Sequence, residues 1–141
     1  MAAYRNAVER GSEIVKLDVR KSKDGVIVLS HDPSFKRTMG WDANISDVTW
    51  EEIRGHVYLF KGQPTEERAV SLPEALEVVK AIPEFWIDFK NFDPEFCERV
   101  LAEFAKAGIG TERIMVATYS RNALPYMKEH HPEIRRIGHM G

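Results

Sequence analysis

Two stretches decide the fold: EIVKLDVR, from Glu13 to Arg20, which alternates strictly, and FWIDFK, from Phe85 to Lys90, which Pro83 and Asn91 bound. Successive side chains of a β-strand point to opposite faces, so residues two apart share a face. The first stretch is therefore predicted as a strand with one apolar face and a second face that carries Lys16 and Asp18. The second stretch places Asp88 two residues before Lys90 in the same way.

Hydrophobic periodicity and turn signals predict the remaining elements. Capping boxes at Thr49/Glu52 and Ser71/Glu74 start two helices, Asp93-Pro94 starts a third and Ser120 caps a fourth. We expect helices over 2–10, within 44–62, and over 72–81, 94–107 and 120–130, and strands over 13–20, 26–29, 85–89, 113–118 and 135–138. This alternation predicts an α/β fold, with a parallel sheet covered by helices.

Composition restricts the classes of protein to which the chain can belong. With 141 residues, 43% hydrophobic and 30% charged, it is one ordinary domain or part of a larger one. The net charge of -2 suggests no nucleic-acid partner, and no apolar run has the ~18 residues that a membrane span needs. A single cysteine, Cys97, excludes an internal disulfide. The start of the chain lacks the apolar core of a signal peptide, so the default expectation for location is the cytoplasm.

Charged residues near the carboxyl ends of three predicted strands indicate where the chemistry lies, because ligands bind at those ends in parallel α/β folds. They are Lys16 with Asp18, His31 just after the second strand, and Asp88 with Lys90. A buried carboxylate needs a paired cation or a metal, and two carboxylates together favour Mg²⁺ or Ca²⁺. A nearby histidine is a candidate general acid or base, which predicts phosphodiester chemistry. A purely structural ion pair of Asp18 with Lys16 or Lys90 is the alternative.

The sequence resembles the glycerophosphodiester phosphodiesterase family over nearly its whole length. The matching segments, in order, are Leu17-Asp18-Val19, Lys23-Asp24-Gly25, His31-Asp32-Pro33, Arg37-Thr38-Met39-Gly40, Asp47 to Glu52, Ser71 to Leu76 and Ile87 to Lys90. The resemblance implies a TIM (β/α)8 barrel that hydrolyses glycerophosphodiesters to glycerol 3-phosphate and an alcohol, as part of lipid metabolism. It also implies two histidines as acid and base, and a divalent metal held by two Glu and one Asp.

Carried over by position, the resemblance makes Asp18 and Asp88 metal ligands, His31 the second catalytic histidine and Lys90 a contact of the substrate phosphate. Asp88 replaces a Glu and is one methylene shorter. Lys16 stands at the place of the first metal-binding Glu, and an ammonium offers donors but no acceptor. We therefore expect binding of Mg²⁺ or Ca²⁺ to be weakened or lost, with Lys16 holding phosphate instead.

Length is the second departure, since a TIM barrel takes about 250 residues. We expect residues 1–141 to form one partial domain, with strands two to six of the family barrel. No segment of the sequence matches the one that carries the family's first catalytic histidine. Three hypotheses stay open: a metal-dependent phosphodiesterase acting on a small glycerophosphodiester, an inactive phosphodiester-binding pseudoenzyme or fragment, and a phospholipase D of the sphingomyelin-cleaving type on the same barrel. The enzyme class that the resemblance implies is a phosphoric diester hydrolase.

Overall fold

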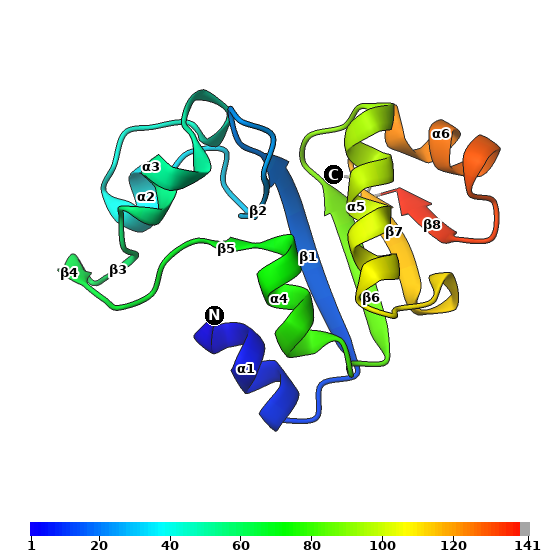
Figure 1. The fold of residues 1–141 in the computed structure, drawn as a ribbon, viewed down its shortest axis with the longest axis horizontal. Coiled ribbons are helices and arrows are strands. Elements are labelled where there is room, and N and C mark those ends of the chain that lie inside the picture. Colours follow the sequence, from blue (N-terminus) through cyan, green and yellow to red (C-terminus); the bar gives the residue numbers. More distant parts are fainter. Residues whose placement is uncertain (139–141) are drawn as a thin grey trace.

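The chain folds around one six-stranded sheet with the strand order β5-β2-β1-β6-β7-β8. The computed structural model describes residues 1–138; residues 139–141, which include His139, lie outside the described part. Figure 1 shows the long strands β1 and β6 side by side at the centre, with helices α4 and α5 in front of them. The short elements between β2 and β5 lie to one side of this central layer.

The elements have the following bounds. The helices are α1 (Ala2–Glu9), α2 (Lys36–Met39), α3 (Trp50–Arg54), α4 (Leu72–Val79), α5 (Pro94–Lys106) and α6 (Ala123–His130), with 3₁₀ turns η1 (Ile45–Asp47) and η2 (Thr111–Arg113). The strands are β1 (Ile14–Lys21), β2 (Ile27–Leu29), β3 (Leu59–Phe60), β4 (Gln63–Pro64), β5 (Val70–Ser71), β6 (Glu84–Phe89), β7 (Ile114–Thr118) and β8 (Arg135–Gly138).

Local capping signals start three of these helices as predicted. Thr49 and Ser71 each form a complete capping box, at α3 and α4. The Asp93 side chain accepts a hydrogen bond from the Phe96 amide at the start of α5. The prediction for Ser120 is wrong, because α6 begins at Ala123 and has no side-chain cap. The Ser120 amide instead donates to the Thr118 hydroxyl, 3.1 Å away.

The sheet is mixed, so the prediction of a parallel sheet is wrong for strand β2. Strands β1, β6, β7 and β8 run parallel, whereas β2 runs antiparallel to both β1 and β5. The physical reason is the tight connection from β1 to β2, where Gly25 has a φ of +84° that favours glycine. A few residues can join antiparallel strands, whereas parallel strands need a crossover of a dozen residues or more.

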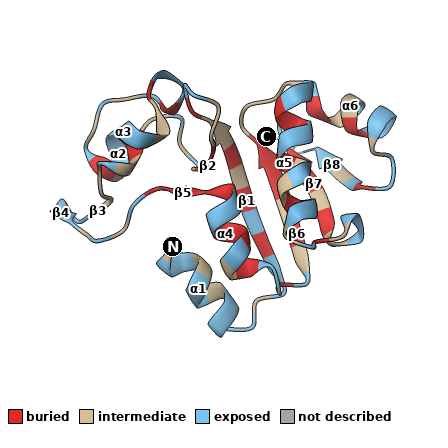
Figure 2. Cartoon of the chain, in the orientation of Figure 1, coloured by how far each residue is buried: buried red, intermediate tan, exposed pale blue. Residues whose placement is uncertain are grey.

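The two faces of the sheet differ in composition. Odd-numbered residues of β1 from Val15 to Val19, and those of β6, are buried under the helices in one core with apolar residues of α4, α5 and α6. Lys21, at the end of β1, is 41% exposed and lies outside this core. Figure 2 shows these buried positions alternating with less buried ones along β1. A second apolar cluster, around Phe35 and Ile53, lies among the short elements between β2 and β5. The even-numbered residues of β1 and β6 form the opposite face, which we call the polar face.

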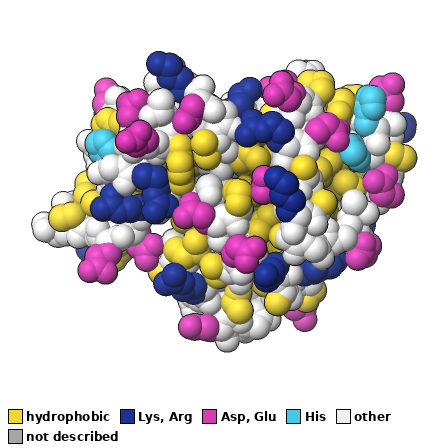
Figure 3. All heavy atoms as spheres, viewed as in Figure 1, with side chains coloured by type: hydrophobic (Ala, Val, Ile, Leu, Met, Phe, Trp, Pro, Cys, Tyr) yellow, Lys and Arg dark blue, Asp and Glu magenta, His cyan; other side chains and the backbone are white. Residues whose placement is uncertain are grey.

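The helix-bearing side carries charges of both signs. Figure 3, viewed from that side, shows Lys and Arg interspersed with Asp and Glu, and apolar atoms between them. Among residues 1–138, no helix is long and apolar enough to span a membrane.

Candidate active site

The polar face brings four of the five predicted site residues together. Asp18 and Asp88 are direct register partners on the parallel strands β1 and β6. The side chain of Asp88 is only 1% exposed and that of Asp18 is 17% exposed. Two carboxylates from segments 70 residues apart in sequence therefore meet at one place on the sheet. The sequence alone predicted the two strands but not that they are neighbours in the sheet.

Two ammonium groups neutralise this pair of carboxylates. The Lys16 nitrogen lies 3.7 Å from Asp18 Oδ1 and 3.8 Å from Asp88 Oδ2. The Lys90 nitrogen lies 2.9 Å from Asp88 Oδ2, although this contact lacks hydrogen-bond geometry. Lys90 also lies 5.7 Å from the centre of the Tyr119 ring, a cation–π distance. The structural ion pairs of the alternative interpretation are thus present, and Lys90 pairs with Asp88 rather than with Asp18.

His31 is connected to the polar face through its backbone rather than through its ring. Arg20, the next residue along the face after Asp18, donates from Nε to the Ser30 carbonyl at 3.1 Å and from Nη2 to the His31 carbonyl at 2.7 Å. The imidazole of His31 is 72% exposed, and its Nδ1 lies 3.0 Å from an Asp32 oxygen. Arg20 was not among the predicted site residues, although its spacing of two residues from Asp18 indicates that both share a strand face.

The electrostatic surroundings of Arg20 and Asp32 follow from these contacts. Burial lowers the pKa of Arg20, and the carboxylates of Asp18, Asp32 and Asp88 oppose that shift. Hydrogen bonds from Arg37 and then His31 lower the pKa of Asp32 to about 2. Asp32 is therefore an ionised acceptor for the ring of His31 at neutral pH.

The donor set does not fit a divalent metal. Three carboxylate oxygens, Asp18 Oδ1 and both of Asp88, are buried without a hydrogen-bond donor, which by itself would suit a cation. The Lys16 ammonium already lies close to both carboxylates, however. Within the described residues, no three His, Cys, Asp or Glu side chains gather where they could hold a metal. Mg²⁺ and Ca²⁺ take six or more oxygen ligands, so two carboxylates beside an ammonium form a poor site.

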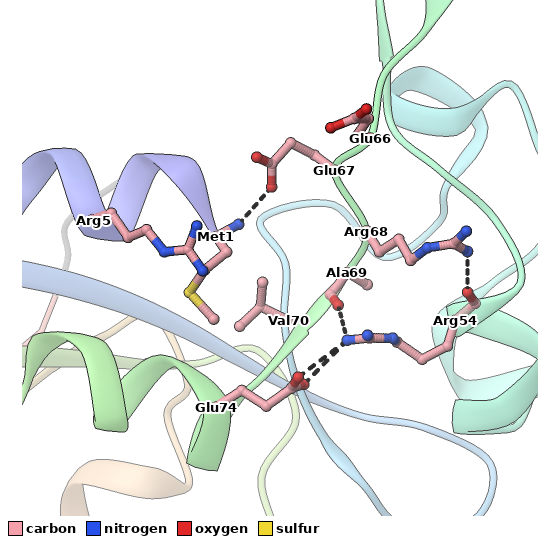
Figure 4. A pocket seen from close by; sticks show the side chains of 9 residues that line it. All are labelled: Met1, Arg5, Arg54, Glu66, Glu67, Arg68, Ala69, Val70 and Glu74. Carbon is pink, nitrogen blue, oxygen red and sulfur yellow. Dashed lines mark hydrogen bonds and ion pairs between the residues drawn. The ribbon is translucent and has the colours of Figure 1, made fainter.

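A separate cavity of about 370 Å³ lies between α1 and the segment that leads into β5. Figure 4 shows its lining side chains, with Arg54 directed at both Glu74 and the Ala69 carbonyl. Arg68 contacts the Arg54 carbonyl. This cavity includes none of the charged residues of the polar face, and its arginines are balanced by three glutamates that also line it. We therefore take the polar face, and not this cavity, as the candidate active site.

Comparison with known proteins places this chain in a family. A profile described as the Glycerophosphoryl diester phosphodiesterase family matches residues 1–139. A Lysophospholipase D GDPD1 of Rattus norvegicus is 35% identical over 91 residues, which cover 60% of this chain and 28% of the relative. A glycerophosphodiester phosphodiesterase of Bacillus altitudinis is 27% identical over 146 residues, covering 95% of this chain and 57% of the relative.

Solved structures agree with the sequence comparison. A glycerophosphodiester phosphodiesterase from Agrobacterium tumefaciens superposes with a TM-score of 0.79 at 26% identity, covering 96% of this chain and 57% of that one. An Oleispira antarctica phosphodiesterase in complex with the product sn-glycerol-3-phosphate gives a TM-score of 0.83 at 25% identity, covering 99% and 59%. The predicted α/β class with a partial barrel is confirmed, with an open rather than closed sheet in residues 1–138. The chain spans less than two thirds of each of these relatives.

Proposed function

Because the chain belongs to the glycerophosphoryl diester phosphodiesterase family, we propose that its polar face binds a glycerophosphodiester and takes part in hydrolysis of the phosphodiester bond. The products would be glycerol 3-phosphate and an alcohol. The observation that carries the proposal is the convergence of Asp18, Asp88, Lys16 and Lys90 at one place on the sheet. The proposed substrate class rests on sequence similarity, and the convergence of these four charged groups supports the proposed position of its site.

Each charged group has a role that its chemistry allows. Lys90 and Lys16 present ammonium donors to phosphate oxygens, which stabilises the negative charge that develops on phosphorus-bound oxygen. Asp18 and Asp88 are the counter-charges that keep these ammonium groups in place. Because the residues present do not suit a divalent metal, we propose that binding of Mg²⁺ or Ca²⁺ is weakened or lost, and no step is assigned to one.

His31 is the proposed proton-transfer group. In hydrolysis a new P–O bond forms from the oxygen of an attacking water, the P–O bond to the alcohol breaks, and one proton of that water is transferred to the departing alcohol oxygen. The His31 imidazole lies 3.0 Å from Asp32. It is suited either to accept the proton of the nucleophile as a general base or to donate a proton to the departing oxygen as a general acid. Arg20 is a positioning residue, since it holds the backbone of His31 against β1.

A second candidate function is phosphodiester binding without turnover. The observation in its favour is Lys16, whose ammonium lies within 4 Å of the oxygens of both carboxylates that a metal would need. This candidate retains Asp18, Asp88 and Lys90 as a binding site and removes the hydrolytic step.

Hydrolysis of glycerophosphocholine by the purified chain, with Mg²⁺ or Ca²⁺ present, separates the two candidates. The phosphodiesterase proposal expects release of glycerol 3-phosphate, with the rate of His31→Ala reduced roughly 100-fold or more, as expected for loss of a general acid or base. His130→Ala is the matched control, because His130 lies at the end of α6. Equal background rates for the wild type and His31→Ala would leave binding as the function of this chain. A cyclic phosphate product would instead indicate phospholipase D chemistry.

A further inference from the structure

We propose that the Lys16 ammonium replaces a divalent cation in this chain, so that Lys16 and Lys90 together bind the phosphate group of the ligand without any bound metal. The inference rests on the proposed function for the class of ligand. It adds which groups hold the phosphate and that neither Mg²⁺ nor Ca²⁺ is required for binding.

The position of Lys16 is the first support. Lys16 precedes Asp18 by two residues on β1, so both side chains lie on the polar face. Its nitrogen lies 3.7 Å from a carboxylate oxygen on β1 and 3.8 Å from one on β6. A single positive charge thus bridges the two carboxylates, which is where a bridging cation would have to lie. Such a cation would therefore need to displace Lys16 and overcome its repulsion.

The depth of the four groups is the second support. Asp88 has 1% of its side chain exposed, whereas Lys16 has 45% and Lys90 has 18%. Asp18, with 17% of its side chain exposed, is about as accessible as Lys90, whereas Asp88 lies beneath both ammonium groups. An anion that approaches the polar face therefore meets the Lys16 ammonium, the most exposed of the four groups, first. The two carboxylates act as counter-charges and offset the repulsion between the two ammonium groups, so both lysines can lie near the same carboxylate.

Unused hydrogen-bond donors are the third support. Each ammonium has three N–H donors. Among the described residues, the acid oxygens nearest to them, on Asp18 and Asp88, accept no hydrogen bond from either lysine. The Trp86 indole N–H, on the register partner of Lys16, is buried and also has no acceptor in the described part of the chain. A phosphate group has several acceptor oxygens and can accept hydrogen bonds from the two ammonium groups.

The test is titration calorimetry of the full chain with sn-glycerol 3-phosphate, with and without EDTA. We expect the affinity to be unchanged by EDTA and by added Mg²⁺ or Ca²⁺. Lys16→Gln should weaken binding roughly 10- to 100-fold, the loss expected for one charge-assisted hydrogen bond. Lys16→Arg should keep most of the affinity, because it keeps the charge. Lys106→Gln is the matched control, since Lys106 is an exposed lysine paired with Glu103 on α5.

Lys16→Glu provides a test in the opposite direction. It would place a third carboxylate beside Asp18 and Asp88, so we expect calorimetric binding of Mg²⁺ or Ca²⁺ itself, which the wild type should lack. Circular dichroism of each variant checks that the fold is kept, and Lys16→Arg carries the test if Lys16→Gln does not fold. Inorganic phosphate, titrated in parallel, shows whether the glycerol portion adds affinity or the site takes any phosphate.

Several outcomes would overturn the proposal: loss of wild-type binding in EDTA, unchanged affinity in Lys16→Gln, or no binding of glycerol 3-phosphate by the folded wild type. Failure of this inference is distinguishable from failure of the proposed hydrolysis. Metal-dependent binding with turnover removes the role of Lys16 and leaves the enzyme, whereas metal-free binding without turnover removes the enzyme and leaves the role of Lys16.

Discussion

The two faces of β1 and β6 perform different tasks with residues that alternate in the same strands. The helix-covered face holds Leu17 and Phe85, both 0% exposed, in a large apolar core. The polar face holds Lys16 and Asp88 in a network of opposite charges. Apolar burial stabilises a fold strongly, whereas an ion pair contributes little beyond its own desolvation cost. We infer that one face maintains the fold and that the other is free to be specialised for a ligand.

The largest effect is expected on the covered face. Phe85 packs edge-to-face against Phe104 with ring centres 5.5 Å apart. Phe85→Ala should lower the free energy of unfolding by about 3–5 kcal/mol, because it removes a large side chain and leaves a cavity. Urea unfolding followed by circular dichroism measures this. A loss below about 1 kcal/mol would contradict the division between the two faces.

Adjacent residues of β1 allow a matched comparison of the faces. Leu17→Ala should cost about 2–5 kcal/mol of stability, since Leu17 is fully buried. Lys16→Ala, one position away, should change stability by about 1 kcal/mol or less, because half-exposed ion pairs are weak. The same urea titration compares the two variants. Equal losses would mean that the polar face is also a structural core.

Asp88→Asn should have an intermediate effect, of about 1–3 kcal/mol. The substitution keeps the shape of a side chain that is 1% exposed but leaves Lys90 beside a neutral amide. We also expect weaker binding of glycerol 3-phosphate, because the ammonium groups lose their shared counter-charge. Thermal unfolding and calorimetry measure the two effects. Asp42→Asn, on an exposed carboxylate, is the control, and an equal change there would remove the special role of Asp88.

The smallest effect is a pH dependence next to the polar face. Because the Arg37 hydrogen bond and His31 lower the pKa of Asp32 to about 2, from an ordinary value of 3.8, ionised Asp32 favours the folded state. This contribution is fully present above the ordinary pKa and is lost as the pH falls toward the folded value. Arg37→Gln should therefore raise the pKa of Asp32, and its stability should differ less from the wild type near pH 2 than near pH 5. A carboxyl NMR titration measures the shift, and an unchanged pKa in Arg37→Gln would refute it.

Most of the secondary structure could be predicted from local rules, because strand alternation and helix capping depend only on residues close together in the sequence. Alternation identified β1, and the flanking residues Pro83 and Asn91 identified β6. The capping boxes at Thr49 and Ser71 identified the starts of α3 and α4. The two-residue strands β3, β4 and β5 and the one-turn helix α2 were not predicted. Segments so short contain no full period of a hydrophobic pattern, and tertiary contacts determine them.

For the candidate site, too, local spacing predicted one part and tertiary contacts determined the rest. Spacing of two residues was enough to place Lys16 with Asp18, and Asp88 with Lys90, on common strand faces. Spacing did not show that Asp18 and Asp88 are register partners, nor that Arg20 reaches back to the His31 carbonyl. Those facts depend on which strands become neighbours and in which direction each one runs.

By itself, the sequence determined which side chains share a strand face, because the alternation of side chains is a local property of the backbone. It also showed that a lysine, and not a glutamate, stands at position 16, so the charge at that position is positive. Only the tertiary structure decided that these acids belong to one cluster, that Lys16 lies between them and that β2 turns back against β1. Register and strand direction are set by packing of the whole core, and no short stretch of sequence contains that information.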